Sequence, residues 1–196
     1  PNPLGLSGVS YNMAIDSVHH RLFVPDFSNN RVLIFNLNSS NQLVDKIPDN
    51  VLGQTTFYTN TGATTQAGII NPRSVAYDSV NDRLFVAQGS SAHRVTVYDV
   101  ASITNGENAV NVLGQTTFTG SSAAVTQAGM STPSGIAYDN SGGRLFVVTN
   151  GGARVVIYDV ASITDGENAV NVLGQATFTS GTSNTTQAGM NNPQGV

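Results

Sequence analysis

Imidazole is the side chain best suited to acid–base work near neutral pH, and it is a common zinc ligand. The chain has three histidines, His19, His20 and His93. His19 and His20 are adjacent in a predicted turn, so their side chains should diverge and make a poor pair of metal ligands. Asn30 and Ala153 stand at the place of His93 in two similar segments, which favours a structural or solvent-exposed role for His93.

Carboxylates and guanidinium groups recur at fixed places along the chain. An aspartate ends an apolar run and an arginine opens the next run in three segments: Asp16 and Arg21, Asp78 and Arg83, Asp139 and Arg144. A catalytic group is usually unique, whereas a recurring pair serves every segment, as a hairpin-turn bond or a strand-edge ion pair. The same reasoning predicts cross-strand pairs for a second series: Arg31, Arg94 and Arg154 with Asp99 and Asp159.

The segment Asp165–Asn168 could hold calcium through oxygen ligands, and Asn105–Asn108 repeats it with one carboxylate fewer. It does not match the EF-hand loop, and a turn closed by an Asx-type side-chain bond accounts for it more simply. The sequence contains no nucleophile elbow, phosphate-binding loop, dinucleotide fingerprint or zinc-protease motif. We therefore predict no catalytic, cofactor-binding or metal-binding residue, and sequons at Asn38 and Asn184 leave glycosylation open.

The composition excludes several classes of protein. Only 10% of the 196 residues are charged, and 12 acidic against 8 basic side chains give a net charge of −4. A chain without a broad cationic surface is a poor partner for nucleic acid. No apolar run approaches the roughly 18 residues of a membrane span, and the absence of cysteine rules out disulfides and thiolate metal sites. Scarce lysine among many Asn, Ser and Thr residues favours an extracellular or cell-surface setting.

Internal repeats organise the whole chain. The string Val-Leu-Gly-Gln-x-Thr-Phe occurs at Val51–Phe57, Val112–Phe118 and Val172–Phe178, at a spacing that is constant to within one position. Between Arg94–Thr119 and Arg154–Thr179 only four of 26 positions differ, which indicates one shared conformation.

Each repeat contains four short runs rich in Val, Ile, Phe and Tyr that are bounded by turn residues, as in β-strands. In the second repeat these strands are predicted at about Ser74–Tyr77, Arg83–Ala87, Arg94–Asp99 and Ala109–Gln115. Helix is limited to a turn or two near Ala101–Thr104 and Ala161–Thr164, and the threonine-rich stretches are loops that cross to the next repeat. Four antiparallel strands at a fixed period predict an all-β fold of propeller blades. The blades are expected at residues 9–57, 71–118 and 132–178, with a fourth repeat starting at 191–196.

The repeat resembles the NHL repeat, whose pattern runs Pro-x-Gly-Val-Ala-x-Asp, Leu-Tyr-Val-Ala-Asp and Asn-His-Arg-Val. The second repeat matches this pattern at Asn71–Asp78, Arg83–Ala87 and His93–Asp99. Val-Leu-Gly-Gln-x-x-Phe also resembles the outer strand of bacterial NHL-like proteins. The resemblance implies a six-bladed ring, of which three blades lie in this chain. It also implies a binding platform, since only some related propellers are enzymes.

Three blades span about half of such a ring, and each open flank would expose a sheet face of roughly 17 by 19 Å. Monomers rarely leave an apolar face of a few hundred Å² uncovered. Additional blades from the same longer chain, a self-associating copy, or a head-to-tail array could cover it. The chain starts with Pro1 rather than Met, and Asn191–Val196 resembles the opening of a fourth repeat, which favours a longer chain.

Two functions remain open at this stage. The first is a non-enzymatic extracellular or cell-surface propeller that acts as a binding or structural scaffold for protein or glycan. The second is a propeller enzyme that resembles lyases or lactonases, with a metal in the central channel and its site in blades not present here. The first strands of these repeats carry no histidine and only the recurring terminal aspartate, which favours the scaffold.

Overall fold

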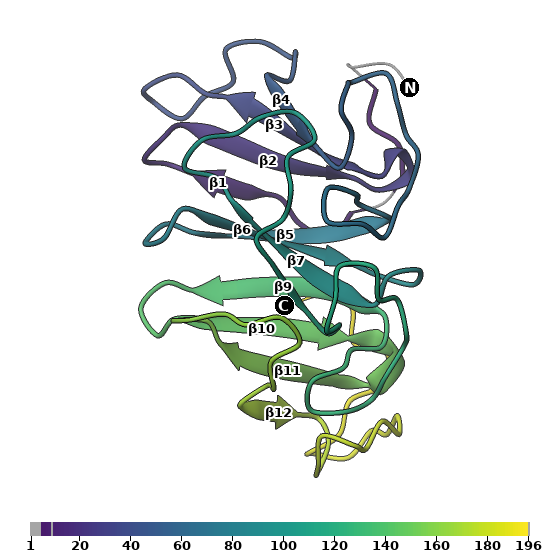
Figure 1. The fold of residues 1–196 in the computed structure, drawn as a ribbon. Helices are drawn as coiled ribbons and strands as arrows, with labels where there is room; N and C mark the ends of the chain where they lie inside the picture. Colours follow the sequence, from purple (N-terminus) through teal and green to yellow (C-terminus); the bar gives the residue numbers. More distant parts are fainter. Residues whose placement is uncertain (1–4, 9, 196) are drawn as a thin grey trace.

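The computed structural model describes residues 5–8 and 10–195. In this part of the chain the regular structure consists of three four-stranded antiparallel sheets and two short 3-10 turns, without an α-helix. The strands of each sheet follow one another in chain order (Figure 1). This is the predicted all-β architecture of propeller blades. Of the segments discussed above, Pro1–Leu4, Val9 and Val196 lie outside the described residues.

Each blade is a meander that ends in a short outer strand. Blade 1 contains β1 (Ala14–Asp16), β2 (Arg21–Asp26), β3 (Arg31–Asn36) and β4 (Asn50–Leu52). Blade 2 contains β5 (Pro72–Asp78), β6 (Arg83–Gln88), β7 (Arg94–Asp99) and β8 (Asn111–Leu113). Blade 3 contains β9 (Pro133–Asp139), β10 (Arg144–Thr149), β11 (Arg154–Asp159) and β12 (Asn171–Leu173). The 3-10 turns η1 (Phe27–Asn29) and η2 (Asn150–Gly152) connect the second and third strands of blades 1 and 3.

The blades have two distinct ends, because their strands are antiparallel. At the hairpin end, the first strand turns into the second and a linker joins the third strand to the fourth. It comprises residues 16–21, 36–50, 78–83, 99–111, 139–144 and 159–171. At the crossing end, the second strand turns into the third, and a threonine-rich loop leads to the next blade. The first hairpins of the blades all lie at the left in Figure 1.

Both faces of each sheet are apolar. Successive side chains of a strand point to opposite faces, so each Arg-Leu-Phe-Val run places its leucine on one face and its phenylalanine on the other. We call the face with Phe23, Phe85 or Phe146 the forward face, and the face with the preceding leucine the rear face. The forward face of blade 1 packs on the rear face of blade 2, and blade 2 packs on blade 3 in the same way.

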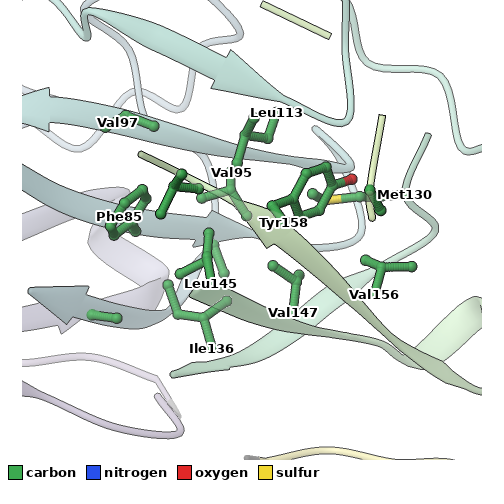
Figure 2. Close-up of a cluster of buried hydrophobic side chains, with 14 residues drawn as sticks. Phe85, Val95, Val97, Leu113, Met130, Ile136, Leu145, Val147, Val156 and Tyr158 are labelled. Atoms are coloured by element: carbon green, nitrogen blue, oxygen red, sulfur yellow. The ribbon is translucent and has the colours of Figure 1, made fainter. Parts of the chain in front are cut away.

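Two hydrophobic cores therefore lie between the blades rather than within one of them. The first core joins Phe23 of blade 1 to Tyr77 of blade 2, whose rings stack at a centroid distance of 5.7 Å. Figure 2 shows the second core, in which Phe85 of blade 2 lies with Leu145 and Tyr158 of blade 3. These residues are at most 9% exposed, so the joints between blades form the hydrophobic interior of the protein.

The structure corrects two details of the predicted strands. The outer strand of blade 2 spans Asn111–Leu113 rather than Ala109–Gln115. It ends at Leu113 because Gly114 adopts a φ of +85° that breaks the extended backbone. Gln115 then donates through its side-chain amide to the carbonyl of His93 at 3.0 Å and holds the turn. Ala101–Thr104 and Ala161–Thr164 each form a bend followed by irregular backbone instead of a helical turn. Within the described residues we find no helical segment that could cross a bilayer.

Replacement of Phe85 by alanine tests the importance of the joint. Phe85 is fully buried, so Phe85→Ala should lower the free energy of unfolding by about 3–5 kcal/mol. Urea unfolding followed by circular dichroism measures the change. Val80→Ala is the control, because Val80 is 70% exposed and its truncation should change the stability by about 0.5 kcal/mol or less. Equal losses in the two variants would contradict the assignment of the core to the joints.

Candidate functional site

An aspartate and an arginine close the first hairpin of blades 1 and 2, as predicted. The Arg21 guanidinium donates to Oδ2 of Asp16 from Nε at 2.9 Å and from Nη2 at 2.5 Å. Two backbone N–H groups of the turn donate to the other oxygen of Asp16. Burial disfavours the charged carboxyl, but these donors outweigh burial and hold the pKa of Asp16 below its ordinary value. Asp78 and Arg83 repeat the pair in blade 2.

The same arginines also link each blade to the next. Arg21 donates from Nη1 to the backbone carbonyl of Val100 in blade 2. Arg83 donates from Nη2 to the matched carbonyl of Val160 in blade 3 at 2.7 Å. Each pair therefore supports both its own hairpin and one joint.

Blade 3 keeps the turn bond but lacks the ion pair. Oδ1 of Asp139 accepts hydrogen bonds from the N–H of Ser141 at 2.9 Å and from its hydroxyl at 2.6 Å, and these bonds lower the pKa of the Asp139 carboxyl. Arg144 is exposed and donates no hydrogen bond to any residue that the structure describes. Among the described residues, no later blade offers a carbonyl to this guanidinium.

One set of three potential metal ligands lies around His19 in the described part of the chain. Nδ1 of His19 lies 3.0 Å from Oδ2 of Asp16 and 3.4 Å from Oδ1 of Asp82. The Arg21 guanidinium already binds this oxygen of Asp16, and the Tyr77 hydroxyl donates to this oxygen of Asp82 at 2.5 Å. We therefore interpret the cluster as a polar link between the hairpins of blades 1 and 2.

The other two histidines hold turns. His20 lies against Asn41, with Nδ1 2.7 Å from the amide oxygen, so its side chain diverges from that of His19 as predicted. Nδ1 of His93 accepts the N–H of Thr132 at 3.0 Å and thereby fixes the backbone that leads into blade 3. Burial lowers the pKa of His93, which favours the neutral ring that this bond requires.

The second series of arginines does not pair with Asp99 and Asp159, so the predicted partners were wrong. Arg31 does form a cross-strand ion pair, but with Asp26, whose Oδ2 lies 2.8 Å from its Nε. Arg31, Arg94 and Arg154 are fully buried at the start of the third strand, whereas the aspartates close that strand at the hairpin end. The two groups therefore lie at opposite ends of the blade.

Each buried arginine instead ties crossing loops to the sheet. In blade 2, Arg94 donates to the carbonyl of Phe118, which follows its own outer strand, and to the carbonyls of Thr65 and Gly68 in the loop from blade 1. Its Nε lies 3.3 Å from the side-chain oxygen of Gln88. Arg154 makes the matched contacts in blade 3, with the carbonyls of Phe178, Thr126 and Gly129. Neutral acceptors thus satisfy most of the donors of these two buried cations.

The segment Asp165–Asn168, for which a turn was preferred over a calcium site, contacts the preceding blade. Oδ1 of Asp165 accepts the N–H of Val112 at 3.0 Å and the side-chain amide of Asn111 at 3.2 Å. Asn105 accepts the N–H of Val51 at 3.0 Å in the same way. The expected side-chain bond is therefore made to the neighbouring outer strand rather than within the turn, and an amide oxygen serves as well as a carboxylate.

Two similar hollows of about 320 and 390 Å³ lie at the rims of the two joints. Gly, Thr, Ala and Gln residues dominate their walls, and no charged side chain lines either one. Because the same hollow recurs at each joint, we attribute it to the way the blades pack.

Charge is divided unequally between the two ends of the blades. Of the 12 carboxylates, 11 belong to the hairpin end, together with Lys46 and the hairpin arginines Arg21, Arg83 and Arg144. The crossing end has one carboxylate, Asp26, and four arginines: Arg31, Arg73, Arg94 and Arg154. The formal charges are therefore −7 at the hairpin end and +3 at the crossing end, which sum to the net −4. The prediction of individual Asp–Arg pairs missed this division of charge, although most acidic residues already stand beside predicted turns in the sequence.

Blades 2 and 3 differ most in their inner halves, which contain the first and second strands. Pro72–Ala87 and Pro133–Val148 differ at eight of 16 positions, against four of 26 in the outer halves. All four residues of the first hairpin turn change between 79–82 and 140–143. The hairpin end thus presents different side chains on closely similar blades.

No model of a known protein family matches the sequence, and no curated protein matches it. Among solved structures, the hydrazine synthase of Kuenenia stuttgartiensis is similar over 87% of this chain and 39% of its own, with 13% identity and a TM-score of 0.54. The RRP9 WD40 repeats are similar over 85% of this chain and 40% of their own, with 14% identity and a TM-score of 0.48. A chain of a nidogen/laminin complex is similar over 74% of this chain and 41% of its own, with 16% identity and a TM-score of 0.47.

At these identities the likeness concerns the fold alone. The chain spans about two fifths of the length of the structures it resembles. The three successive four-stranded antiparallel sheets, packed face to face, define an all-β protein of propeller blades.

The role of His93 can be tested by its pH dependence. Because the folded chain lowers the pKa of His93 below 6.5, the unfolded chain binds more protons as the pH falls below about 6.5. The free energy of unfolding should therefore fall with pH in this range. His93→Ala should cost about 1 kcal/mol at neutral pH through the lost hydrogen bond. Urea titrations at about pH 7.5 and 5.5 measure both effects.

His93→Asn is the matched variant, because the side-chain oxygen of Asn30 accepts the N–H of Asn71 at 2.9 Å in the equivalent turn. It should keep the neutral-pH stability and lose the part of the pH dependence that His93 contributes. A pH dependence unchanged from that of the natural chain would contradict this assignment.

Proposed function

We propose that this chain is a non-enzymatic binding scaffold whose partner is a protein with a basic surface, bound at the hairpin end. The division of charge between the two ends carries the proposal. Clustered charge of one sign steers a partner of the opposite sign and fixes its orientation. A neutral oligosaccharide would gain little from such a field, so a protein partner is favoured over a glycan.

The outermost acidic groups of this end are accessible. Asp99, Asp159 and Asp165 are all exposed, and each stands at the end of a third strand or in the linker that follows it. Arg21 and Arg83 are already paired with Asp16 and Asp78, and Arg144 stands opposite Asp159 in the sheet register without a hydrogen bond to it. The exposed carboxylates are therefore accessible to the cations of a partner.

Binding accounts for the titratable groups better than catalysis does. The recurring aspartates and arginines hold hairpins, joints and crossing loops, as described above. What varies between the blades is the hairpin turns, and recognition residues commonly lie in loops that a rigid scaffold positions. The sparsely charged, lysine-poor composition supports a place outside the cell or on its surface for this scaffold.

A triple variant tests the proposal without disturbing the fold. The variant carries Asp99→Asn, Asp159→Asn and Asp165→Asn. Blade 1 already has asparagine, Asn36, at the position of Asp99 and Asp159, and blade 2 has Asn105 at the position of Asp165. Exposed ion pairs contribute about 0.2–1 kcal/mol each, so loss of three should raise the Kd for a fluorescein-labelled oligolysine peptide roughly tenfold. Fluorescence anisotropy at low and high salt measures the Kd. Added salt should raise the Kd of the natural chain for oligolysine.

Arg73→Ser is the matched control at the crossing end, because blade 3 has Ser134 at this position. It also changes the net charge but leaves the hairpin end intact, so binding of oligolysine should be preserved. Failure of the natural chain to bind oligolysine, or equal weakening by the control, would contradict the proposal.

A further inference from the structure

The first strands of the blades contact one another and so form the inner edge of the protein. At the crossing end of this edge, each repeat places one residue at the position that follows the opening proline of β5 and β9. The residue differs in every repeat: it is Tyr11, Arg73, Ser134 or Gln194. We infer that these side chains form a binding site for a carboxylate group, with the Arg73 guanidinium as its cation. The inference is independent of the proposed basic partner, which binds the other end of the blades.

A β-bulge sets the direction of this side chain in blades 2 and 3. In blade 2, the register shifts by one residue between Pro72 and Ser74, which leaves Arg73 without a partner opposite it in β6. The register of β9 shifts over the matched residues, Ser134 and Gly135. Bulges interrupt the regular alternation of a strand and commonly re-aim a side chain at a functional site. In keeping with this, Arg73 belongs to neither hydrophobic core.

Polar contacts bring three of the four side chains together. Nη1 of Arg73 donates to the hydroxyl of Tyr11 at 3.1 Å, and this hydroxyl donates to Oε1 of Gln194 at 2.5 Å. The backbone N–H of Tyr11 also donates to the carbonyl of Arg73 at 2.6 Å. Residues that are far apart in the sequence therefore meet at one place on the inner edge.

Aromatic rings and a glycine hold the Arg73 guanidinium in position. Its Cζ lies 5.8 Å from the ring centroid of Tyr11 and 5.3 Å from that of Phe27, within the range of cation–π contact. A Cβ added at Gly89 would lie 2.2 Å from Nε of Arg73 and 3.2 Å from the carbonyl of Pro133. The glycine therefore leaves the room that the guanidinium occupies beside β9.

Arg73 has hydrogen-bond donors and a charge that no described residue satisfies. Its buried Nε and its Nη2 donate to no residue that the structure describes. The side chain of Ser134 is fully buried, and its hydroxyl is likewise unbonded within the described chain. The one carboxylate of the crossing end, Asp26, is paired with Arg31 at 2.8 Å. A cation without a counter-ion among the described residues therefore lies beside a second unused donor.

These properties favour a carboxylate over other common anions. A guanidinium presents its N–H groups in one plane and binds both oxygens of a carboxylate through two parallel hydrogen bonds. The other arginines of the crossing end are buried against Asp26 or loop carbonyls, and the single lysine, Lys46, lies at the hairpin end. One guanidinium neutralises one carboxylate, whereas a phosphate group carries a charge of about −1.5 to −2 at neutral pH. The charge of Arg73 thus matches a single carboxylate.

An NMR titration of the whole chain tests the inference, with the arginine Nε–H signals as the readout. Acetate at constant ionic strength should shift the signal of Arg73 and saturate it at roughly millimolar concentrations. Acetamide, a neutral molecule of similar shape, should cause no shift. A shift that does not saturate, or an equal shift of Arg144, would overturn the inference, because it indicates general screening of charge. Tighter binding of inorganic phosphate than of acetate would also overturn it.

A peptide probe distinguishes the source of the carboxylate. An acetylated Gly-Glu-Gly amide carries one carboxylate on a peptide chain. A Kd about tenfold or more below that of acetate would assign the site to an acidic protein segment. A Kd similar to or above that of acetate would assign it to a small organic acid. Failure of both probes to bind would overturn the inference.

Removal of the guanidinium tests the role of Arg73. Arg73→Ser should abolish the saturable response to acetate, which the backbone N–H signals of Tyr11 and Ser134 report in this variant. Blade 3 already has serine at this position, so the β-sheet circular dichroism should be unchanged. Arg144→Ser is the matched control, because it removes the same charge at the hairpin end, and it should keep acetate binding. Retention of binding in Arg73→Ser, or its loss in both variants, would overturn the inference.

Gly89→Ala tests the position of the guanidinium at constant charge. The new Cβ would displace Nε of Arg73, so the Kd for acetate should rise about tenfold, as for the loss of one hydrogen bond to a charged group. Blades 1 and 3 have Phe27 and Asn150 at this position, so the turn accepts a side chain. An unchanged Kd would overturn the assignment. Binding of oligolysine should be unchanged in both Arg73→Ser and Gly89→Ala, so failure of one proposal is distinguishable from failure of the other.

Discussion

The whole structure depends on sheets that are apolar on both faces. Leu84 and Phe85 are neighbours in β6, point to opposite sides and are both fully buried, each in a different core. No blade can bury both faces alone, so each requires a neighbour on either side. Among the blades that the structure describes, this requirement is met on both faces of blade 2 and on one face each of blades 1 and 3. The arrangement of the molecule follows from this property of a single strand.

Hydrogen bonds from arginine give these joints their register. An apolar face by itself tolerates sliding, whereas a guanidinium has several donors in a fixed geometry. Arg94 at the crossing end binds loop carbonyls from before and after its own blade, and Arg83 at the hairpin end binds both its own turn and the next blade. Arg83 and Arg94 are thus placed where they hold one blade against another or against its crossing loop.

This use of charge also shapes what the surface can recognise. The buried arginines contact the crossing loops, while the aspartates that end the strands collect at the hairpin end. The outer halves of blades 2 and 3 are nearly identical, and the hairpin turns differ at every position. The proposed binding of a basic protein therefore rests on exposed carboxylates at the ends of the third strands and in the linkers, beside first-hairpin turns that differ between blades 2 and 3.

The sequence by itself determined the number of blades, the four strands in each and the structural role of the Asp16–Arg21 pair, because these depend on period-two alternation and on contacts within one hairpin. It predicted the diverging side chains of His19 and His20 for the same reason. It could not show that Arg94 binds loop carbonyls instead of Asp99, or that Asp165 bonds to Val112 of another blade, since such partners are distant in the chain and belong to other loops or blades. Only the tertiary structure decided these contacts, because they exist only once the blades stand side by side.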